Sequence, residues 1–310
     1  MKYLFIANPI AGKGKTKKLL DTIKNFLDKQ NVNFELIETN GPNSISDLVK
    51  ERGPFFDRII VIGGDGTIHE LVNSEKVFDK ILGVLPTGSG NDFALSLGLK
   101  KNLYRNLQVI LEENILDVDI GYAEITEFSG KKFSFLFANS LGIGFDAEVA
   151  EFSRKISFLR GLFLYLISVF IILFKYKYRS LIIETPSLKI SEPLFMISIG
   201  NGKTAGGGFK LTPLANPVDG LFDICIVKKI SRLKVLRILP LAIFGKHISN
   251  KSVIYNKAKE IFITSDKPIY IHADGEIRSS NLKSVKIVLL NRHAKFLRNG
   301  ISYVNEKTRT

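Results

Sequence analysis

The strongest constraint on how this chain folds is an alternation, in its first third, of short β-rich runs with helical patterns and glycine-rich turns. The β-rich runs occupy residues 4–7, 34–38, 58–62 and 81–85, and the helical patterns residues 15–29, 44–51 and 67–72. Strands that alternate with helices form a parallel sheet, because each helix carries the chain back to the edge where the previous strand began. Such sheets bind ligands at the loops that follow the carboxyl ends of their strands.

From about residue 115 the pattern changes to longer β-rich stretches. They occupy residues 115–125, 132–139, 181–185, 194–200, 221–227, 261–264, 269–273 and 285–290. An antiparallel second domain is the simplest arrangement for them, with helical inserts at residues 146–174 and 231–244. A chain of 310 residues, 45% of them hydrophobic, can bury two such cores without disulfides or zinc. The predicted fold class is therefore α/β, with a parallel N-terminal and an antiparallel C-terminal domain.

Charge and cysteine content limit the partners and the compartment. The formal net charge of +14 implies attraction to polyanions. No helix-turn-helix, zinc-finger or aromatic RNA-binding pattern accompanies it, so we expect no nucleic-acid partner. A single cysteine, Cys225, excludes a disulfide framework and a multi-cysteine metal site, which favours a reducing, cytoplasmic location. The first residues resemble a secretory signal only briefly, and we interpret them as a strand.

The sharpest motif follows the third β-rich run, where Gly63, Gly64, Asp65, Gly66 and Thr67 lead into a helix. Glycines permit positive φ and lack a Cβ atom, so backbone N–H groups and the helix N-terminus can approach a polyanion. We expect Asp65 to lie beside bound phosphates, acting through Mg²⁺ or water. The alternative is a tight turn in which Thr67 caps the helix. The position directly after a parallel strand favours phosphate binding.

A second glycine-rich segment, residues 86–93, follows the fourth β-rich run and should lie at the same edge of the sheet. Together the two loops would form a cleft. Ser89 can hydrogen-bond a phosphate or a base. Asn91 and Asp92 can instead cap the next helix, which is the favoured alternative for these two residues.

Three familiar kinds of site are excluded by spacing. The first loop ends in Gly14-Lys15-Thr16, but Pro9 stands where a P-loop requires glycine. The histidines show no metal-ligand spacing, and no serine occurs in a nucleophile-elbow context. We therefore expect neither a P-loop NTPase, nor a histidine metal centre, nor a covalent serine hydrolase.

Two acidic segments lie late in the chain. Asp274 and Glu276 stand two residues apart, so they share a face if the preceding strand continues, and paired carboxylates suit proton abstraction and Mg²⁺ binding. The alternative is that Asp274-Gly275 forms a hairpin turn. Asp219, within residues 216–223, can bind a cation with neighbouring carbonyls, since hard cations prefer oxygen ligands, or can form only a turn.

Two stretches favour contact with a membrane surface. Residues 161–174 form a fourteen-residue uncharged run, shorter than the about 20 residues that a bilayer span requires. A buried helix over the second sheet and an interfacial helix are the two interpretations. Between Asp223 and Glu260 there are nine lysines and arginines and no acidic residue. That suits docking on an anionic membrane, although a solvated helix face explains it equally well.

Taken together, these segments resemble the lipid kinases of the bacterial diacylglycerol kinase, sphingosine kinase and ceramide kinase superfamily. The motifs occur in the family's order, at residues 8–14, 63–67, 88–93, 139–146, 219–220 and 274–276. The resemblance implies an ATP-binding α/β domain over residues 1–124, similar to those of phosphofructokinase and NAD kinase. It further implies a β-sandwich lipid-substrate domain over residues 125–292 and a segment, residues 293–310, that returns to the first domain.

Carried over by position, the resemblance implies three sets of site residues. ATP would be bound by Asn8, Pro9, Ile10, Ala11, Gly12, Thr39, Gly63, Gly64, Asp65, Gly66, Thr67, Ile68, His69, Glu70, Gly88, Ser89, Asn91 and Asp92. Asp274 and Glu276 would activate the lipid hydroxyl, either of them as the base, with Asp65 assisting catalysis near Mg²⁺. A second, structural Mg²⁺ would be held by Asp219 and the carbonyls of Asn216 and Leu221. Ser89 replaces the family's usual threonine, and the cluster around Asp219 has fewer carboxylates than in many relatives.

The resemblance thus predicts an ATP- and Mg²⁺-dependent kinase that phosphorylates the hydroxyl of a lipid such as diacylglycerol and associates peripherally with anionic membranes. Such transfers depend on positioning and electrostatics, which agrees with motifs made of glycines and carboxylates. The alternatives are an NAD kinase-like enzyme acting on a soluble hydroxyl and a non-catalytic nucleotide- or lipid-binding module. The sequence leaves open which lipid is used and whether the chain forms a homodimer.

Overall fold

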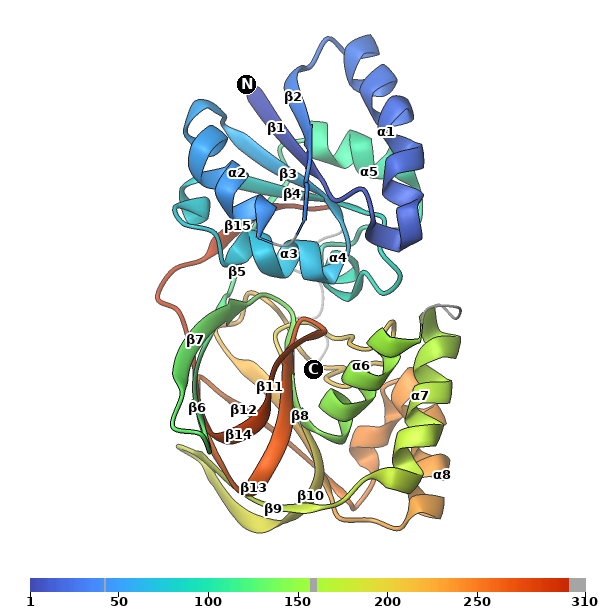
Figure 1. The fold of residues 1–310 in the computed structure, drawn as a ribbon, viewed down its shortest axis with the longest axis vertical. Coiled ribbons are helices and arrows are strands. Elements are labelled where there is room, and N and C mark those ends of the chain that lie inside the picture. Colours follow the sequence, from blue (N-terminus) through green and yellow to red (C-terminus); the bar gives the residue numbers. More distant parts are fainter. Residues whose placement is uncertain (42, 157–160, 301–310) are drawn as a thin grey trace, which may run out of the picture.

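The computed structural model describes residues 1–41, 43–156 and 161–300, and shows two domains stacked along the long axis of the molecule (Figure 1). The first domain contains a six-stranded sheet in the order β2-β1-β3-β4-β15-β5, and the second a nine-stranded sheet. Strands β1 to β4 are parallel, whereas the strand pairs of the second sheet are antiparallel. The predicted fold class is confirmed.

The first domain follows the predicted alternation of strands and helices. Its elements are β1 (Lys2–Ala7), α1 (Ala11–Lys29), β2 (Asn33–Glu38), α2 (Ser44–Arg52), β3 (Arg58–Gly63), α3 (Asp65–Val72), β4 (Ile81–Pro86), α4 (Asp92–Ser96), α5 (Leu103–Leu111) and β5 (Ile115–Val118). In the strand register Ala7 lies beside Ile62, and Gly63 beside Pro86. The loops after β1, β3 and β4 therefore leave the sheet at the same level, as the sequence predicts for a binding edge.

Helices cover both faces of this sheet because its strands are apolar on both sides. Leu4 and Ile6 of β1 point to the core under α2, α3 and α4, whereas Phe5 points to the core under α1 and α5. On that second face Ile23 and Leu27 of α1 are fully buried, as their helical spacing predicts. The sheet is thereby fixed from both sides, and its loop edge is left to face the second domain.

The second domain begins where the chain leaves the first sheet. Its elements are β6 (Gly121–Glu127), β7 (Lys132–Phe137), β8 (Ser140–Gly144), α6 (Phe145–Lys155), α7 (Gly161–Lys175), β9 (Arg179–Thr185), β10 (Leu188–Gly200), β11 (Phe222–Lys228), α8 (Arg232–Ile243), β12 (Val253–Ala258), β13 (Glu260–Ala273) and β14 (Glu276–Leu289). The strand order is β12-β11-β10-β8-β13-β14-β6-β7, and β9 pairs with both β10 and β13.

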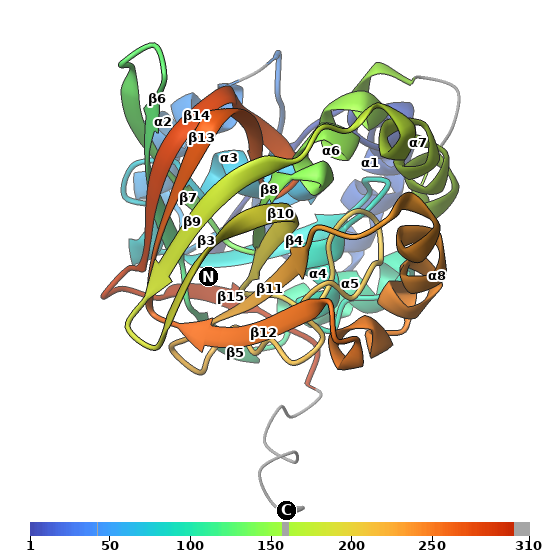
Figure 2. The same cartoon turned by 90° about the horizontal axis from the view of Figure 1, so that it is seen from below.

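Two apolar layers hold this domain together. One lies among the strands and includes Ile143, Ile197 and Ile263. The other lies where α6, α7 and α8 cover one side of the sheet, and it contains Phe145 and the fully buried Cys225. Figure 2 shows α7 and α8 side by side on that flank.

The chain crosses between the domains twice. It first crosses from β5 to β6, and it returns after β14 to form β15 (Ala294–Leu297), which lies between β4 and β5 in the first sheet (Figure 1). A segment near the end of the sequence thus completes the N-terminal sheet, which places both crossings close to each other at one side of the interdomain cleft.

Three predicted elements have different limits in the structure. Residues 115–125 are divided between β5 and β6, because the chain changes sheets at Asp119 and Ile120. The runs 261–264 and 269–273 form one strand, β13, whose pairing with β14 shifts in register between them. The insert at 146–174 is two helices, and residues 157–160 lie outside the described part of the chain. The expected domain limit after residue 124 falls inside β6.

Candidate functional site

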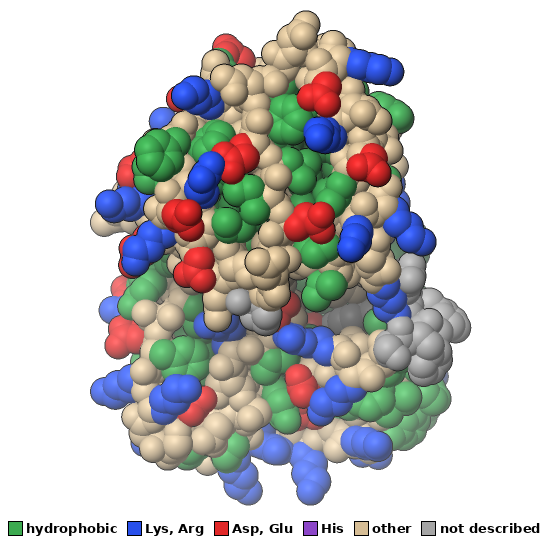
Figure 3. All heavy atoms as spheres, turned by 45° about the horizontal axis from the view of Figure 1, so that its top comes forward, with side chains coloured by type: hydrophobic (Ala, Val, Ile, Leu, Met, Phe, Trp, Pro, Cys, Tyr) green, Lys and Arg blue, Asp and Glu red, His purple; other side chains and the backbone are tan. Residues whose placement is uncertain are grey.

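The predicted loops meet the second domain in a cleft between the two sheets. Figure 3 shows the hollow between the two halves of the molecule, bordered by lysine and arginine side chains. Two adjoining pockets make up the cleft, with volumes of about 700 and 450 Å³. Gly66, Arg154 and Glu276 line both pockets, so the two pockets form one continuous site.

The three glycine-rich loops pack against one another at the floor of this cleft. A Cβ atom on Gly12 would lie 2.2 Å from the carbonyl oxygen of Thr87, and one on Gly88 would lie 2.6 Å from Cα of Gly64. These approaches are too close for any side chain, so the glycines are required by contact between backbones. Gly12 also has a φ of +60°, which glycine adopts readily. The loops therefore present backbone, rather than side chains, to a ligand.

The second domain reaches these loops through the hairpin turn between β13 and β14. Asp274 and Gly275 form the turn, with φ values of +50° and +82°. The strand does not continue through Asp274, so Asp274 and Glu276 do not share a strand face, and the hairpin-turn alternative holds. A Cβ atom on Gly66 would lie 2.6 Å from Glu276 Oε1. The Glu276 carboxylate therefore lies directly against the glycine-rich loop at residues 63–67.

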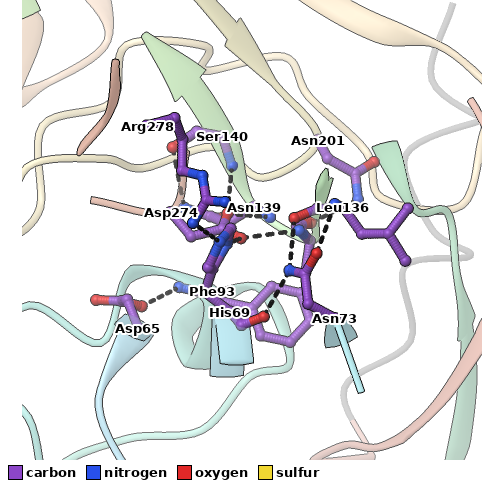
Figure 4. Close-up of polar contacts among 11 residues, drawn as sticks. Asp65, His69, Asn73, Phe93, Leu136, Asn139, Ser140, Asn201, Asp274 and Arg278 are labelled. Carbon is purple, nitrogen blue, oxygen red and sulfur yellow. Dashed lines mark hydrogen bonds and ion pairs between the residues drawn. The ribbon is translucent and has the colours of Figure 1, made fainter. Parts of the chain in front are cut away.

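The Asp274 carboxylate is buried and bound by donors on both oxygens (Figure 4). Oδ1 accepts from the backbone N–H groups of Asn139 at 2.8 Å and Ser140 at 3.0 Å. Oδ2 accepts from the N–H of Ala138 at 3.1 Å and lies 3.1 Å from His69 Nδ1. Asp274 thereby ties β8 of the second domain to α3 of the first.

The tautomer of His69 follows from its other contact. Arg278 Nη1 lies 3.3 Å from His69 Nε2, and a guanidinium can only donate, so Nε2 accepts. The proton is therefore on Nδ1, which donates to Asp274. Arg278 also stacks over Phe135, with its guanidinium carbon 4.6 Å from the ring centroid, and this contact orients it toward the cleft.

Glu276 is held differently from Asp274. Its side chain is 37% exposed, and Oε2 forms an ion pair with Nη1 of Arg154 at 2.5 Å. Arg154 belongs to α6, and its own side chain is half exposed. Both members of this pair line the cleft. Both carboxylates line the cleft, but Glu276 is the more exposed of the two, whereas Asp274 is buried among protein donors.

Asp65 and Asp92 form a second acidic pair at the cleft. Asp65 Oδ1 accepts from the N–H of Phe93 at 3.1 Å, and Asp92 Oδ2 accepts from the N–H of Gly207 at 2.7 Å. Burial and the neighbouring charge of Asp92 raise the pKa of Asp65 from 3.8 to about 7, and burial also raises the pKa of Asp92. Asp92 Oδ1 is buried without a hydrogen-bond partner. Two neighbouring carboxylates offer the oxygen ligands that a hard divalent cation prefers.

Most of the residues expected to bind nucleotide line the cleft or the adjoining surface pocket beside β2. These are Asn8, Pro9, Ile10, Ala11, Gly12, Thr39, Gly64, Asp65, Gly66, Thr67, His69, Glu70, Gly88, Ser89 and Asp92. Gly63, Ile68 and Asn91 line none of these pockets: Ile68 is buried in the core under α3, and Asn91 hydrogen-bonds the Gly88 carbonyl. The role of Asn91 in the structure is to shape the loop.

Several cleft residues were not singled out from the sequence. Lys13, Arg154 and Arg278 supply the cations that line it. His272 Nε2 lies 3.0 Å from Asp146 Oδ2, a buried pair that also faces the cleft. Lys13 and Asp146 lie inside the motifs at residues 8–14 and 139–146 that carry the family resemblance, although no role was assigned to them from the sequence, and Arg278 is close to Glu276 in the chain. The position of Arg154 depends on the placement of α6, which the sequence does not reveal.

The segment around Asp219 lies apart from the cleft. Asp219 Oδ1 accepts from the N–H of Leu221 at 3.1 Å, and Oδ2 lies 3.0 Å from Lys257 Nζ. Both carboxylate oxygens of Asp219 therefore already have donors, whereas Asn216 Oδ1 is buried without a hydrogen-bond partner in the described part of the chain. Over the described residues, no group of three or more His, Cys, Asp or Glu side chains is placed to hold a metal ion.

Helix α7 covers the second sheet with one face only. Val169 and Leu173 are buried, whereas Phe170 and Phe174 are exposed. No helix within the described residues is both long and apolar enough to cross a membrane.

Comparison with known proteins agrees with this geometry. Residues 2–123 match the diacylglycerol kinase catalytic domain, and residues 139–288 match the YegS C-terminal NAD kinase beta sandwich-like domain. The Bacillus subtilis protein named "Putative lipid kinase YtlR" is 34% identical over 292 residues, which cover 89% of this chain and 93% of that protein. A diacylglycerol kinase of Staphylococcus aureus (strain MRSA252) is 32% identical over 276 residues, which cover 87% of this chain and 84% of that enzyme.

Solved structures give the same result. A structure described as "a putative diacylglycerol kinase from Bacillus anthracis" has a TM-score of 0.77 and 25% identity, and covers 96% of this chain and 95% of its own. An NAD kinase from Archaeoglobus fulgidus in complex with ATP shares the fold alone, with a TM-score of 0.53 and 16% identity over 97% of this chain and 94% of its own. The chain is therefore a kinase that belongs to the diacylglycerol kinase catalytic domain family of lipid kinases.

Proposed function

We propose that this chain transfers the γ-phosphoryl group of ATP to the hydroxyl of a lipid such as diacylglycerol, and that it does so in the interdomain cleft. The observation that carries this proposal is the contact between Gly66 and Glu276. It places a carboxylate of the substrate domain against a glycine loop of the kind that binds phosphates. The domain proposed to bind ATP and the domain proposed to bind the lipid thus meet at this contact.

On the nucleotide side, the backbone of the three glycine loops would bind the phosphates. Lys13, Arg154 and Arg278 add positive charge around the same space. The unpartnered Oδ1 of Asp92 and the adjacent Asp65 fit a cation, so we assign Mg²⁺ to this pair. Bound there, Mg²⁺ would neutralise part of the negative charge on the phosphate oxygens.

On the acceptor side, we assign the base to Glu276. Both carboxylates line the cleft, but Asp274 is buried and already has four polar contacts, three of them from backbone N–H groups. Glu276 is partly exposed and forms an ion pair with Arg154. An arriving phosphoryl group would compete for Arg154 and leave Glu276 free to accept the hydroxyl proton. The hydroxyl oxygen then bonds to the γ-phosphorus, the bond to the β-phosphate oxygen breaks, and ADP leaves.

The carboxylate substitution Glu276→Gln tests this assignment. With label on the γ-phosphate of ATP and a lipid extract in Mg²⁺-containing micelles, wild type should place label in a chloroform-soluble product, and the variant should not. Glu260→Gln is the matched control, because Glu260 lies at the other end of the same hairpin and forms an exposed ion pair with Lys286. Equal activity of the Glu276→Gln and wild-type proteins would contradict the assignment, and no transfer by wild type would favour a non-catalytic binding module.

We further propose that the flank formed by α7 and α8 contacts an anionic membrane, from which the lipid is taken. Phe174 of α7, Leu233 of α8 and Phe244, which directly follows α8, are exposed. Exposed cations stand near them in the chain: Lys175, Arg232, Arg237 and Lys246. Arg232 joins the two helices, donating to the carbonyls of Leu173 and Phe174 at 3.1 and 3.0 Å. Apolar side chains ringed by cations are typical of surfaces that insert into anionic interfaces.

A further inference from the structure

The loop between β10 and β11 holds an ammonium group where the family resemblance implies a metal. Lys257 lies on β12, directly opposite Asp223 of β11 in the strand register. Its Nζ atom is 3.0 Å from Asp219 Oδ2 and 3.1 Å from Asp223 Oδ2. Lys257 therefore bridges the two carboxylates that could otherwise bind a cation.

The other carboxylate oxygens of Asp219 and Asp223 also have hydrogen-bond donors. The N–H of Leu221 points at Asp219 Oδ1, at 3.1 Å, and the hydroxyl of Tyr255 donates to Asp223 Oδ1 at 2.8 Å. A divalent cation needs six or more oxygen ligands with their lone pairs directed at it. Here an N–H donor, a hydroxyl donor and an ammonium occupy the carboxylate oxygens instead.

We infer that Lys257 takes the place of the structural divalent cation in this chain, and that the segment 216–223 is metal-independent. Asp223 is fully buried, and a buried carboxylate without a cation is strongly destabilising. The Lys257 ammonium lies within ion-pair distance of both carboxylates, at 3.0 and 3.1 Å. It therefore supplies the positive charge that a metal would bring.

The contacts of this loop show what the lysine supports. The N–H of Gly220 donates to Asp119 Oδ2 at 2.8 Å, and the N–H of Asp119 donates to the carbonyl of Pro217 at 2.8 Å. Asp119 lies in the first crossing between the domains. His293, in the second crossing, lies 3.0 Å from Asp119 Oδ1 through Nδ1. Lys257 thus fixes the loop that joins both crossings.

The test compares metal content and thermal unfolding of nucleotide-free protein. All variants are made in an Asp65→Asn background, so that the cleft does not bind the added metal. The parent should carry no stoichiometric divalent cation after gel filtration, and its Tm should be the same in EDTA and in Mg²⁺. Lys257→Met should lower the Tm, and Mg²⁺ should restore part of the loss by binding the freed carboxylates. Lys257→Arg, which keeps the charge, should stay insensitive to metal.

Lys286→Met is the matched control, since Lys286 makes an exposed ion pair on another strand of the same sheet; its Tm should change little and show no response to Mg²⁺. One divalent cation per chain in the parent protein, or a fall of its Tm in EDTA, would overturn the inference. So would a Lys257→Met protein whose Tm matches that of the Lys286→Met control. These readouts do not involve phosphoryl transfer, so they stand apart from the proposed function.

Discussion

Asp274 and Glu276 are two residues apart in the chain, yet their surroundings give them different tasks. Asp274 accepts three backbone N–H groups and faces His69, whereas Glu276 forms an ion pair with Arg154 at the edge of the cleft. The first arrangement stabilises a structure, and the second leaves an oxygen available for a substrate. Sequence alone gives both residues the same weight, because their spacing is compatible with either role.

These surroundings predict different effects for the two amide substitutions. Asp274→Asn turns one acceptor oxygen into an NH₂ group that faces N–H donors, so it should lower the free energy of unfolding by about 1–3 kcal/mol and also reduce activity. Glu276→Gln should abolish transfer and leave the free energy of unfolding within about 0.5 kcal/mol of wild type. Urea unfolding and the lipid-labelling assay measure the two effects. Unchanged stability of the Asp274→Asn protein would contradict the role given to Asp274.

Asp65→Asn should make the metal-free protein more stable and inactive. Because the pKa of Asp65 is raised to about 7 from 3.8, the folded state binds a proton in this interval that the unfolded state does not. Stability therefore falls as the pH rises between these values. The substitution removes that loss, which we expect to be about 1–2 kcal/mol because Asp65 is half-buried. Thermal unfolding in EDTA across this pH range checks it, and a variant less stable than wild type above pH 7 would count against the prediction.

Gly88→Ala should disrupt the contact between the loop that follows β3 and the loop that follows β4. The added Cβ would lie 2.6 Å from Gly64 Cα, so the loops must separate, at a cost of about 1–3 kcal/mol and at least about tenfold in ATP affinity. Gly53→Ala is the control, because its Cβ would meet Ile59 Cδ1 at an ordinary 3.4 Å. Calorimetric titration with ATP compares them, and equal affinities in the two variants would rule out the backbone-contact explanation.

Among the helices, α7 and α8 each have a buried and an exposed face. Their inner faces close the core around Cys225, which explains why residues 161–174 are too apolar for an ordinary surface helix. The buried-helix interpretation of residues 161–174 thus accounts for the inner face of α7. The outer faces carry exposed apolar side chains and cations, which support the membrane contact proposed above.

Phe174→Ser together with Phe244→Ser should weaken binding to vesicles that contain anionic lipid. These two side chains are 51% and 68% exposed, so replacing them removes insertion without disturbing the core. We expect at least about a tenfold loss of affinity, equivalent to about 1.4 kcal/mol. Phe55→Ser is the control, because Phe55 is 69% exposed on the first domain. Cosedimentation that falls equally in both proteins would exclude α7 and α8 as the docking surface.

At the level of elements, the sequence predicts what depends on neighbours in the chain. The β-rich runs and helical periods of residues 1–86 anticipate β1 to β4 and their crossover helices, because parallel strands buried on both faces read as apolar runs. The division of residues 115–125 between two sheets was missed, because Val118 and Ile120 are both fully buried in the same core, and periodicity carries no mark of a crossing. The turn at Asp274 was an open alternative for the same reason.

For the whole molecule, the site exists only because the loop edge of the first sheet is held against the second domain. Topology predicted that the loops at residues 63–67 and 86–93 share an edge, and the structure confirms this. It could not predict that Arg154 of α6 and Arg278 of β14 stand across from them, since that depends on the relative placement of the domains. The return of β15 to the first sheet helps to fix this placement.

The central claim is that the acceptor in this cleft is a lipid hydroxyl. The most direct measurement is a competition in one reaction, with γ-labelled ATP, Mg²⁺, diacylglycerol in mixed micelles and NAD, followed by separation of the organic and aqueous phases. If the acceptor is a lipid hydroxyl, the wild-type protein should place label in phosphatidic acid in the organic phase and none in NADP. The Glu276→Gln protein should place label in neither product. Label that enters NADP and not lipid would contradict the account and make the chain an NAD kinase-like enzyme.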